Sequence, residues 1–251
     1  MSFFSKQTLF LLIFYMDGYM GKIKICFIMF FLLHATTAFA NYYPTIQTLL
    51  SEHYSHSSDK ENPWHKDNSE SEMDNYRICE NKNVPFSSTD SLLVMCPDTK
   101  LATSLNQDIP TDIYLLQKSD KGYEIIGAEK NIGSHYAGMT VIAPDKWAVE
   151  LSFGSNSQGY LQVQRYLEIF SGSNLKNIAQ WTAHMGNSND SSSIVNNLIV
   201  ERDKPLVNGF YPLLVSSTST EKRKKSKKSY NIFYDEKLAQ YKIPDDLMQG
   251  Y

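Results

Sequence analysis

Strict alternation of apolar and polar side chains is the feature that most constrains what this chain can fold into. Between residues 147 and 153, the side chains of Trp147, Val149, Leu151 and Phe153 fall on one side of an extended backbone, and polar or small residues fall on the other. The same period of two returns at 161–169 and at 179–185. A period of two is that of a strand with one buried face, so the chain is expected to form sheets.

Three segments have the form of a hairpin, with two such strands joined by a short turn. They are Ile113–Ile126, Leu167–Trp181 with a turn at residues 171–174, and Tyr230–Ile243 with a turn around Asp235. No amphipathic helix separates the strands, which argues against parallel βαβ units. We therefore predict an all-β fold, an antiparallel meander of three units that forms a β-sandwich or a partial propeller-like domain.

The first forty residues have the pattern of an export signal. Lys22 and Lys24 precede an apolar run at residues 25–33, and Ala38-Phe39-Ala40 supplies a site for signal peptidase. This pattern predicts a signal region at 1–40, cleavage after Ala40 and a true start at Met20. A tandem membrane anchor is the alternative. Removing these residues takes away three lysines and one aspartate, which leaves a mildly acidic chain.

Two regions are expected after the cleavage site. In residues 41–75, helical spacing of Ile46, Leu49, Leu50 and Tyr54 predicts a short N-terminal helix. The rest of that region, from residue 55 onward, is almost entirely polar and is interpreted as a linker. The β domain is expected to occupy residues 76–251.

Cysteine usage predicts one disulfide. Cys26 lies in the signal region, so the mature chain keeps only Cys79 and Cys96. In an exported protein such a pair is most simply a bridge. It would close a loop of about 18 residues and contribute roughly 3 kcal/mol in the chain-entropy model.

A basic run near the C-terminus is the candidate binding site. It holds six cationic side chains within eight residues, so it is expected to be an exposed hairpin loop. The residues are Lys222, Arg223, Lys224, Lys225, Lys227 and Lys228. Such a loop is either a solvated tip or an electrostatic contact for an anionic partner.

Motifs for enzymatic chemistry are weak in this sequence. The string at 154–159 lacks the glycine spacing of a nucleophile elbow and is interpreted as a hairpin turn. His53, His56 and His65 lie close together, but in a polar segment, so they are interpreted as solvated and not as metal ligands. No catalytic residue, cofactor or metal is therefore predicted. An alternative is a hydrolase site assembled only in three dimensions, with His135 and His184 as candidates.

One C-terminal region resembles a known class of module. Asp203–Leu213, followed by Tyr230–Asp235, is similar to the repeat units of secreted FG-GAP/VCBS-type modules and to hairpins of periplasmic lysozyme-inhibitor-like proteins. The resemblance implies a secreted β module. In the calcium-binding versions, Asp or Asn recurs at alternate positions near the turn, whereas Lys204 and Pro205 follow Asp203 here. No calcium ligand is therefore assigned.

Together these patterns predict an exported, non-enzymatic binding protein that is periplasmic or secreted. The expected partner is another envelope or secreted protein, and the protein would act as an inhibitor or immunity-type partner of a cell-envelope toxin or hydrolase. The alternatives are an envelope hydrolase and a protein that binds an anionic envelope surface through residues 222–228. A nucleic-acid partner is not expected, because export removes the chain from that polymer.

Overall fold

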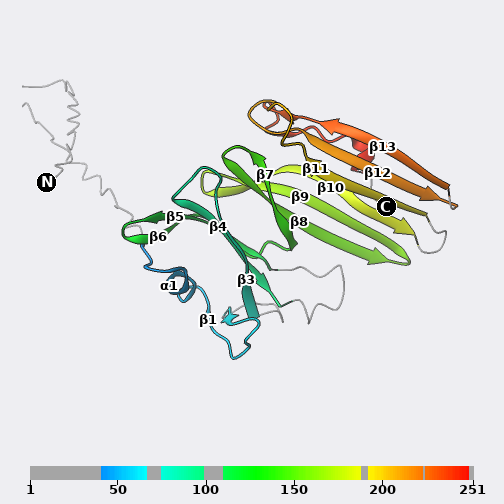
Figure 1. Ribbon diagram of the computed structural model, residues 1–251. Coiled ribbons are helices and arrows are strands. Elements are labelled where there is room, and N and C mark those ends of the chain that lie inside the picture. Colours follow the sequence, from blue (N-terminus) through cyan, green and yellow to red (C-terminus); the bar gives the residue numbers. More distant parts are fainter. Residues whose placement is uncertain (1–40, 67–74, 99–109, 188–191, 223, 249–251) are drawn as a thin grey trace, which may run out of the picture. The chain divides into compact units, whose positions relative to one another are not determined.

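A computed structural model gives the structure of the chain (Figure 1), and it describes residues 41–66, 75–98, 110–187, 192–222 and 224–248. The predicted signal region, residues 1–40, lies outside the described residues. Strands form most of the described chain, and every strand pair is antiparallel. This confirms the predicted all-β antiparallel meander. None of the described helices has the length and apolar character of a membrane-spanning segment.

Among the described residues, two large sheets are formed by strands that pair with their neighbours in the sequence. The six-stranded sheet contains β1 (Ser55–His56), β2 (Trp64–His65), β3 (Asn75–Asn83), β4 (Asp90–Pro97), β5 (Asp112–Ser119) and β6 (Gly122–Glu129). The seven-stranded sheet contains β7 (His135–Ala143), β8 (Lys146–Ser157), β9 (Tyr160–Ser171), β10 (Asn174–Asn187), β11 (Ser192–Val200), β12 (Leu213–Glu221) and β13 (Lys224–Ile232). A small pair, β14 (Tyr234–Asp235) and β15 (Gln240–Tyr241), and a 3-10 turn, η2 (Asp245–Leu247), complete the C-terminal region. The strands are thus grouped as two large sheets and one pair, whereas the sequence suggested three similar units.

The two large sheets pack face to face through apolar side chains. Leu92, Val94 and Ile113 of the six-stranded sheet form one buried cluster with Val149 and Leu151 of the seven-stranded sheet. Val149 and Leu151 are among the side chains that the period of two placed on one face. Burial of this kind contributes about 25 cal/mol per Å² of apolar surface, so the inter-sheet cluster is a main source of stability.

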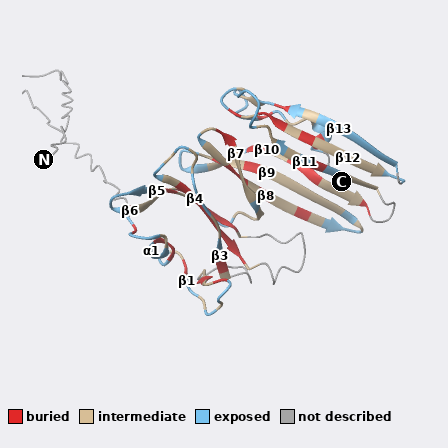
Figure 2. Ribbon diagram, in the orientation of Figure 1, coloured by how far each residue is buried: buried red, intermediate tan, exposed pale blue. Residues whose placement is uncertain are grey.

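The six-stranded sheet is covered on its other face by the N-terminal segment. Helix α1 (Ile46–Leu50) follows Thr45, whose side chain caps the first turn, and it buries Leu49 and Leu50 against the sheet. Strand β4 is consequently buried on both faces, as Figure 2 shows by its colour. The predicted N-terminal helix is therefore present, although shorter than the apolar spacing suggested.

Part of the segment expected to be a polar linker forms strands instead. Residues 55–56 and 64–65 pair with each other, and Trp64 pairs with Tyr76 at the edge of the six-stranded sheet. Trp64 is only 5% exposed, so one large side chain is enough to anchor an otherwise polar segment. The remainder of the expected linker, residues 67–74, lies outside the described residues.

The seven-stranded sheet is curled, and its inner face is closed by C-terminal residues. The backbone N–H of Tyr211, after β11, donates to the carbonyl oxygen of Ile142 on β7 at 2.8 Å, although three strands separate β7 from β11 in the sheet order. Phe210, Tyr241 and Leu247 pack into the core of this sheet. The curl brings strands from both ends of the sheet to one hydrophobic core.

Glu168 on β9 gives the fold a pH-dependent component. Burial, and then the nearby charge of Glu129, raise the pKa of the Glu168 carboxyl. A raised carboxyl pKa means that the folded state binds the proton more tightly than the unfolded chain, so this contribution favours folding at low pH and is lost as the pH rises through the folded pKa. We expect Glu168→Gln to be more stable than the wild type at pH 7, by about 1 kcal/mol or less.

Urea unfolding at pH 7 and pH 4 measures this effect. The advantage of the Gln variant should shrink toward pH 4, near the ordinary pKa of glutamate of about 4.3. An advantage of the same size at both pH values would contradict the assignment.

Candidate functional site

The disulfide Cys79–Cys96 clamps the hairpin formed by β3 and β4. The predicted bridge is present, with the two Cα atoms 5.8 Å apart. Cys79 is the extra residue of a β-bulge, because the register passes from Ile78 opposite Met95 to Glu80 opposite Val94. A bulge re-aims the side chain that it carries, and here Cys79 bonds to a cysteine that is not directly opposite it.

The tip of this clamped hairpin displays one large apolar side chain. Phe86 is 93% exposed, the highest value among the exposed large apolar residues in the described part of the chain. Its backbone has a φ of 58°, in the left-handed region that bulky side chains rarely adopt. Pro85 precedes it, and the N–H of Ser87 donates to the carbonyl oxygen of Val84 at 3.0 Å to close the turn.

The base of the tip is held by an aromatic side chain from the other sheet. The indole N–H of Trp147, on β8, donates to the carbonyl oxygen of Asn83 at 2.7 Å. The ammonium group of Lys82 lies 5.5 Å from the centre of the same indole ring. The hairpin is therefore fixed at two points, by the disulfide and by Trp147, and its apolar tip is presented on a supported base.

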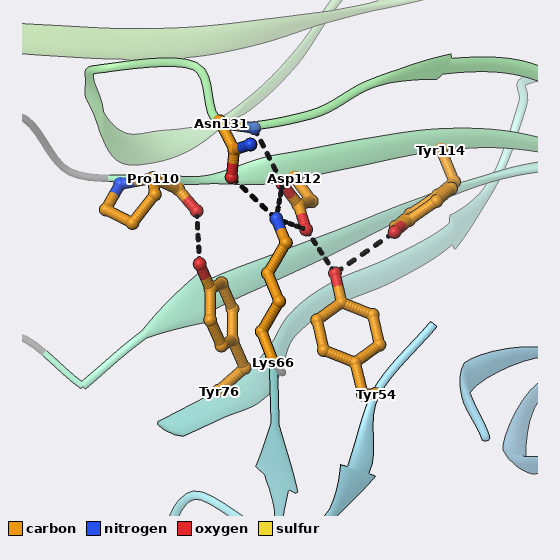
Figure 3. A network of polar contacts seen from close by, with 7 residues as sticks. All are labelled: Tyr54, Lys66, Tyr76, Pro110, Asp112, Tyr114 and Asn131. Carbon is orange, nitrogen blue, oxygen red and sulfur yellow. Dashed lines mark hydrogen bonds and ion pairs between the residues drawn. The ribbon is translucent and has the colours of Figure 1, made fainter. Parts of the chain in front are cut away.

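A buried polar network lies on the face of the six-stranded sheet that the N-terminal segment covers (Figure 3). The carboxylate of Asp112 is fully buried and accepts hydrogen bonds from the ammonium group of Lys66 at 2.8 and 3.0 Å. It also accepts from the backbone N–H of Asn131 at 2.7 Å and from the hydroxyl of Tyr54. The Asn131 side chain accepts a further hydrogen bond from Lys66 at 2.6 Å.

Burial shifts the pKa values of four side chains around Asp112. Burial, and then charges nearby, raise the pKa values of the Tyr54 and Tyr114 hydroxyls, whose oxygens lie 3.1 Å apart. Burial also lowers the pKa values of His53 and Lys130, both of which lie against the Tyr114 ring. The network joins the N-terminal segment, β5 and the segment after β6, and we interpret it as a structural clamp.

The predicted basic site is only partly a loop. Lys222 lies in a turn, but Lys224, Lys225, Lys227 and Lys228 belong to β13, the outermost strand of the seven-stranded sheet. All five lysines are exposed, as expected. The basic run was predicted to be a loop, but strand β13 begins within it, at Lys224. Arg223 lies outside the described residues.

The candidate enzymatic residues are not brought together. His135 lies on β7 and His184 on β10, with β8 and β9 between them. Of the string at 154–159, which was predicted to be a hairpin turn, residues 154–157 continue strand β8, and the turn itself consists of Gln158 and Gly159, both with positive φ angles.

The three clustered histidines have separate contacts. His53 stacks on Tyr114, His56 stacks on Trp64, and His65 hydrogen-bonds to Asn75. Within the described residues there is no group of three or more His, Cys, Asp or Glu side chains that could hold a metal ion.

Two important residues were not identified from the sequence. Phe86 had a usable signal, because it is a lone aromatic residue after a proline in a polar turn. Asp112 had none, because its partner Lys66 is 46 positions away.

Comparison of the chain with protein-family models, with curated proteins and with solved structures finds no match.

Proposed function

We propose that this chain is an exported, non-enzymatic binding protein that recognises a second envelope or secreted protein through the β3–β4 hairpin. The proposal is supported mainly by Phe86, an exposed aromatic side chain on a hairpin that a disulfide closes. The disulfide also fits the oxidising compartment that the signal-like N-terminus suggests. The kind of partner that we favour is a cell-envelope toxin or hydrolase, which the protein would inhibit.

The conformation of Phe86 argues for a role outside the fold. A bulky residue in the left-handed region costs on the order of 1 to 3 kcal/mol, and here the fold gains no apolar burial from the side chain in return. Rigid presentation lowers the entropy lost on association, so a clamped hairpin is a suitable scaffold for an aromatic anchor. Aromatic anchors in the centre of an interface commonly contribute 2 kcal/mol or more, as a rough guide.

The energetics favour a protein pocket over a lipid bilayer. Burying one phenylalanine side chain is worth about 1.5 to 3 kcal/mol. A myristoyl chain, which is far larger, gives only marginal membrane binding. The hairpin turn adds only the half-buried Val84 and Pro85 to the apolar surface of Phe86, and the residues that follow, Ser87, Ser88 and Thr89, are polar. A preformed pocket on a protein supplies the shape complementarity and hydrogen bonds that one side chain lacks.

Phe86→Asn tests the proposal without weakening the fold. Asparagine tolerates the left-handed region, so the variant should be as stable as the wild type, or more stable by up to about 1 kcal/mol. We expect affinity purification of the mature protein from envelope extract to recover a stoichiometric protein partner, and the variant to lose it. Phe233→Ser is the matched control, since Phe233 is also exposed, at 47%, and should keep the partner.

A second measurement addresses inhibition. The wild-type protein should slow the clearing of peptidoglycan by the same extract, whereas Phe86→Asn should not. If Phe86→Asn and Phe233→Ser recovered the same partner, the role of the hairpin would be refuted. If the wild-type protein recovered no partner, the proposed function would be refuted.

A further inference from the structure

The N-terminal half of β13 forms a basic edge at the far end of the seven-stranded sheet. We define the basic edge as Lys224, Lys225, Lys227 and Lys228, together with Lys222 in the preceding turn. Every residue from Lys224 to Ser229 is exposed, so both faces of the strand meet solvent there, and Figure 2 shows this end of β13 in the colour of exposed residues. The strand lies beyond the hydrophobic core, which it joins only at Tyr230 and Ile232.

The charges of the basic edge are distributed over two faces. Successive side chains of a strand point to opposite sides, so Lys225 and Lys227 lie on one face and Lys224 and Lys228 on the other. At about 3.4 Å per residue, the run from Lys224 to Lys228 is roughly 14 Å long. Because β13 is the outermost strand of the described sheet, the outward-facing N–H groups of its backbone are not used in a ladder.

Among the described residues, Lys228 forms an ion pair and Lys224 lies opposite Glu221 in the β12–β13 ladder, whereas Lys225 and Lys227 lie opposite threonines. The ammonium group of Lys228 is 2.6 Å from the carboxylate of Asp246, which also accepts a hydrogen bond from Tyr230 at 2.5 Å. Lys224, Lys225 and Lys227 make no ion pair or side-chain hydrogen bond with the described residues. The register places Thr220 beside Lys225 and Thr218 beside Lys227, which adds hydroxyl donors to one face.

From this arrangement we infer that the basic edge binds a linear polyanion, a sulfated or phosphorylated polysaccharide that runs along β13. A flexible anionic chain can meet lysines on both faces of a narrow edge, and it can accept hydrogen bonds from the outward N–H groups and the threonine hydroxyls. A flat bilayer reaches only one face at a time. This inference does not depend on the hairpin of Phe86, so Phe86→Asn should bind the polyanion as the wild type does.

Lysines on an edge strand also have a structural use, which the test must separate from ligand binding. Charged side chains at a sheet edge prevent pairing with the edge of another molecule. If that were their sole role, neutralising them would cause self-association and would leave polyanion binding unchanged.

Heparin serves as the probe, with the mature protein and a triple variant, Lys224→Gln, Lys225→Gln and Lys227→Gln. The matched control carries Lys204→Gln, Lys237→Gln and Lys242→Gln, three exposed lysines outside β13 with the same total change in charge. We expect the triple variant to bind heparin at least tenfold more weakly and the control to stay within about twofold of the wild type. Wild-type affinity should fall as salt rises toward physiological ionic strength, where the Debye length is about 8 Å.

Four outcomes would overturn the inference. The first is the absence of wild-type binding to heparin at low salt, and the second is an equal loss of heparin affinity in the triple variant and the control. The third is tighter binding of the wild type to phosphatidylglycerol vesicles than to heparin. The fourth is self-association of the triple variant with unchanged heparin affinity. Size-exclusion chromatography of all three proteins measures the last of these.

Discussion

Asp112→Ala is expected to destabilise the fold by about 3 to 5 kcal/mol, the typical cost of removing one partner of a buried ion pair. The substitution leaves the ammonium group of Lys66 partly buried, with 15% of its side chain exposed and its carboxylate partner gone. It also removes the acceptor of the Asn131 backbone N–H and of the Tyr54 hydroxyl. Urea unfolding at pH 7 gives the change as a shift in midpoint, with little change in slope.

A double-mutant cycle separates the pair from its surroundings. Lys66→Met should cost a similar amount, since it strands the Asp112 carboxylate, and the double variant should cost much less than the sum of the two. Asp145→Ala is the control, because Asp145 forms an ion pair with Lys146 in which the side chains are 65% and 41% exposed, and its loss should change stability by less than about 1 kcal/mol. Additive effects at Asp112 and Lys66 would show that the network does not act as a clamp.

Replacing both bridge cysteines, Cys79→Ser with Cys96→Ser, is expected to cost about 2 to 4 kcal/mol. The bridge closes a segment with a sequence separation of 17, and the greater part of this cost comes from the larger number of conformations open to the unfolded chain. Cys96 is also 9% exposed and belongs to the inter-sheet cluster, so the introduced hydroxyl adds to the loss. Thermal or urea unfolding measures the difference.

The same variant tests how the hairpin is presented. Partner affinity should fall even where the variant is folded, because the hairpin that carries Phe86 is then less restricted before binding. Wild-type protein treated with a reductant should reproduce both effects. If the reduced wild type kept its full stability, the bridge would contribute nothing to the fold, and the account of the clamp would be wrong.

The all-β fold could be predicted because the pattern of each strand is local. The alternation at Trp147, Val149 and Leu151 predicts that these side chains face the core, and the short polar turns predict which strands are neighbours. The disulfide followed from a simple count of cysteines. The grouping into two large sheets could not be predicted, because it depends on how faces pack across the chain and leaves no local pattern.

The polar network around Asp112 illustrates the limit of the sequence. Lys66 sits in a segment so polar that it was interpreted as a linker, and only its tertiary contact with Asp112 shows that it is held. The N-terminal half of strand β13 was interpreted as a loop for a related reason, since its lysines favour solvent while its pairing with β12 extends as far as Lys224 opposite Glu221. In both places tertiary contacts overrode what local composition favours.

Photo-crosslinking at the hairpin tip tests the central claim, that this protein acts by binding another protein through Phe86. p-Benzoylphenylalanine is introduced in place of Phe86 in cells of the source organism, with Phe233 as the control position, and the cells are irradiated. The account predicts one discrete adduct with a second protein at position 86 and none at position 233. No adduct at position 86, or the same set of adducts at both positions, would contradict it.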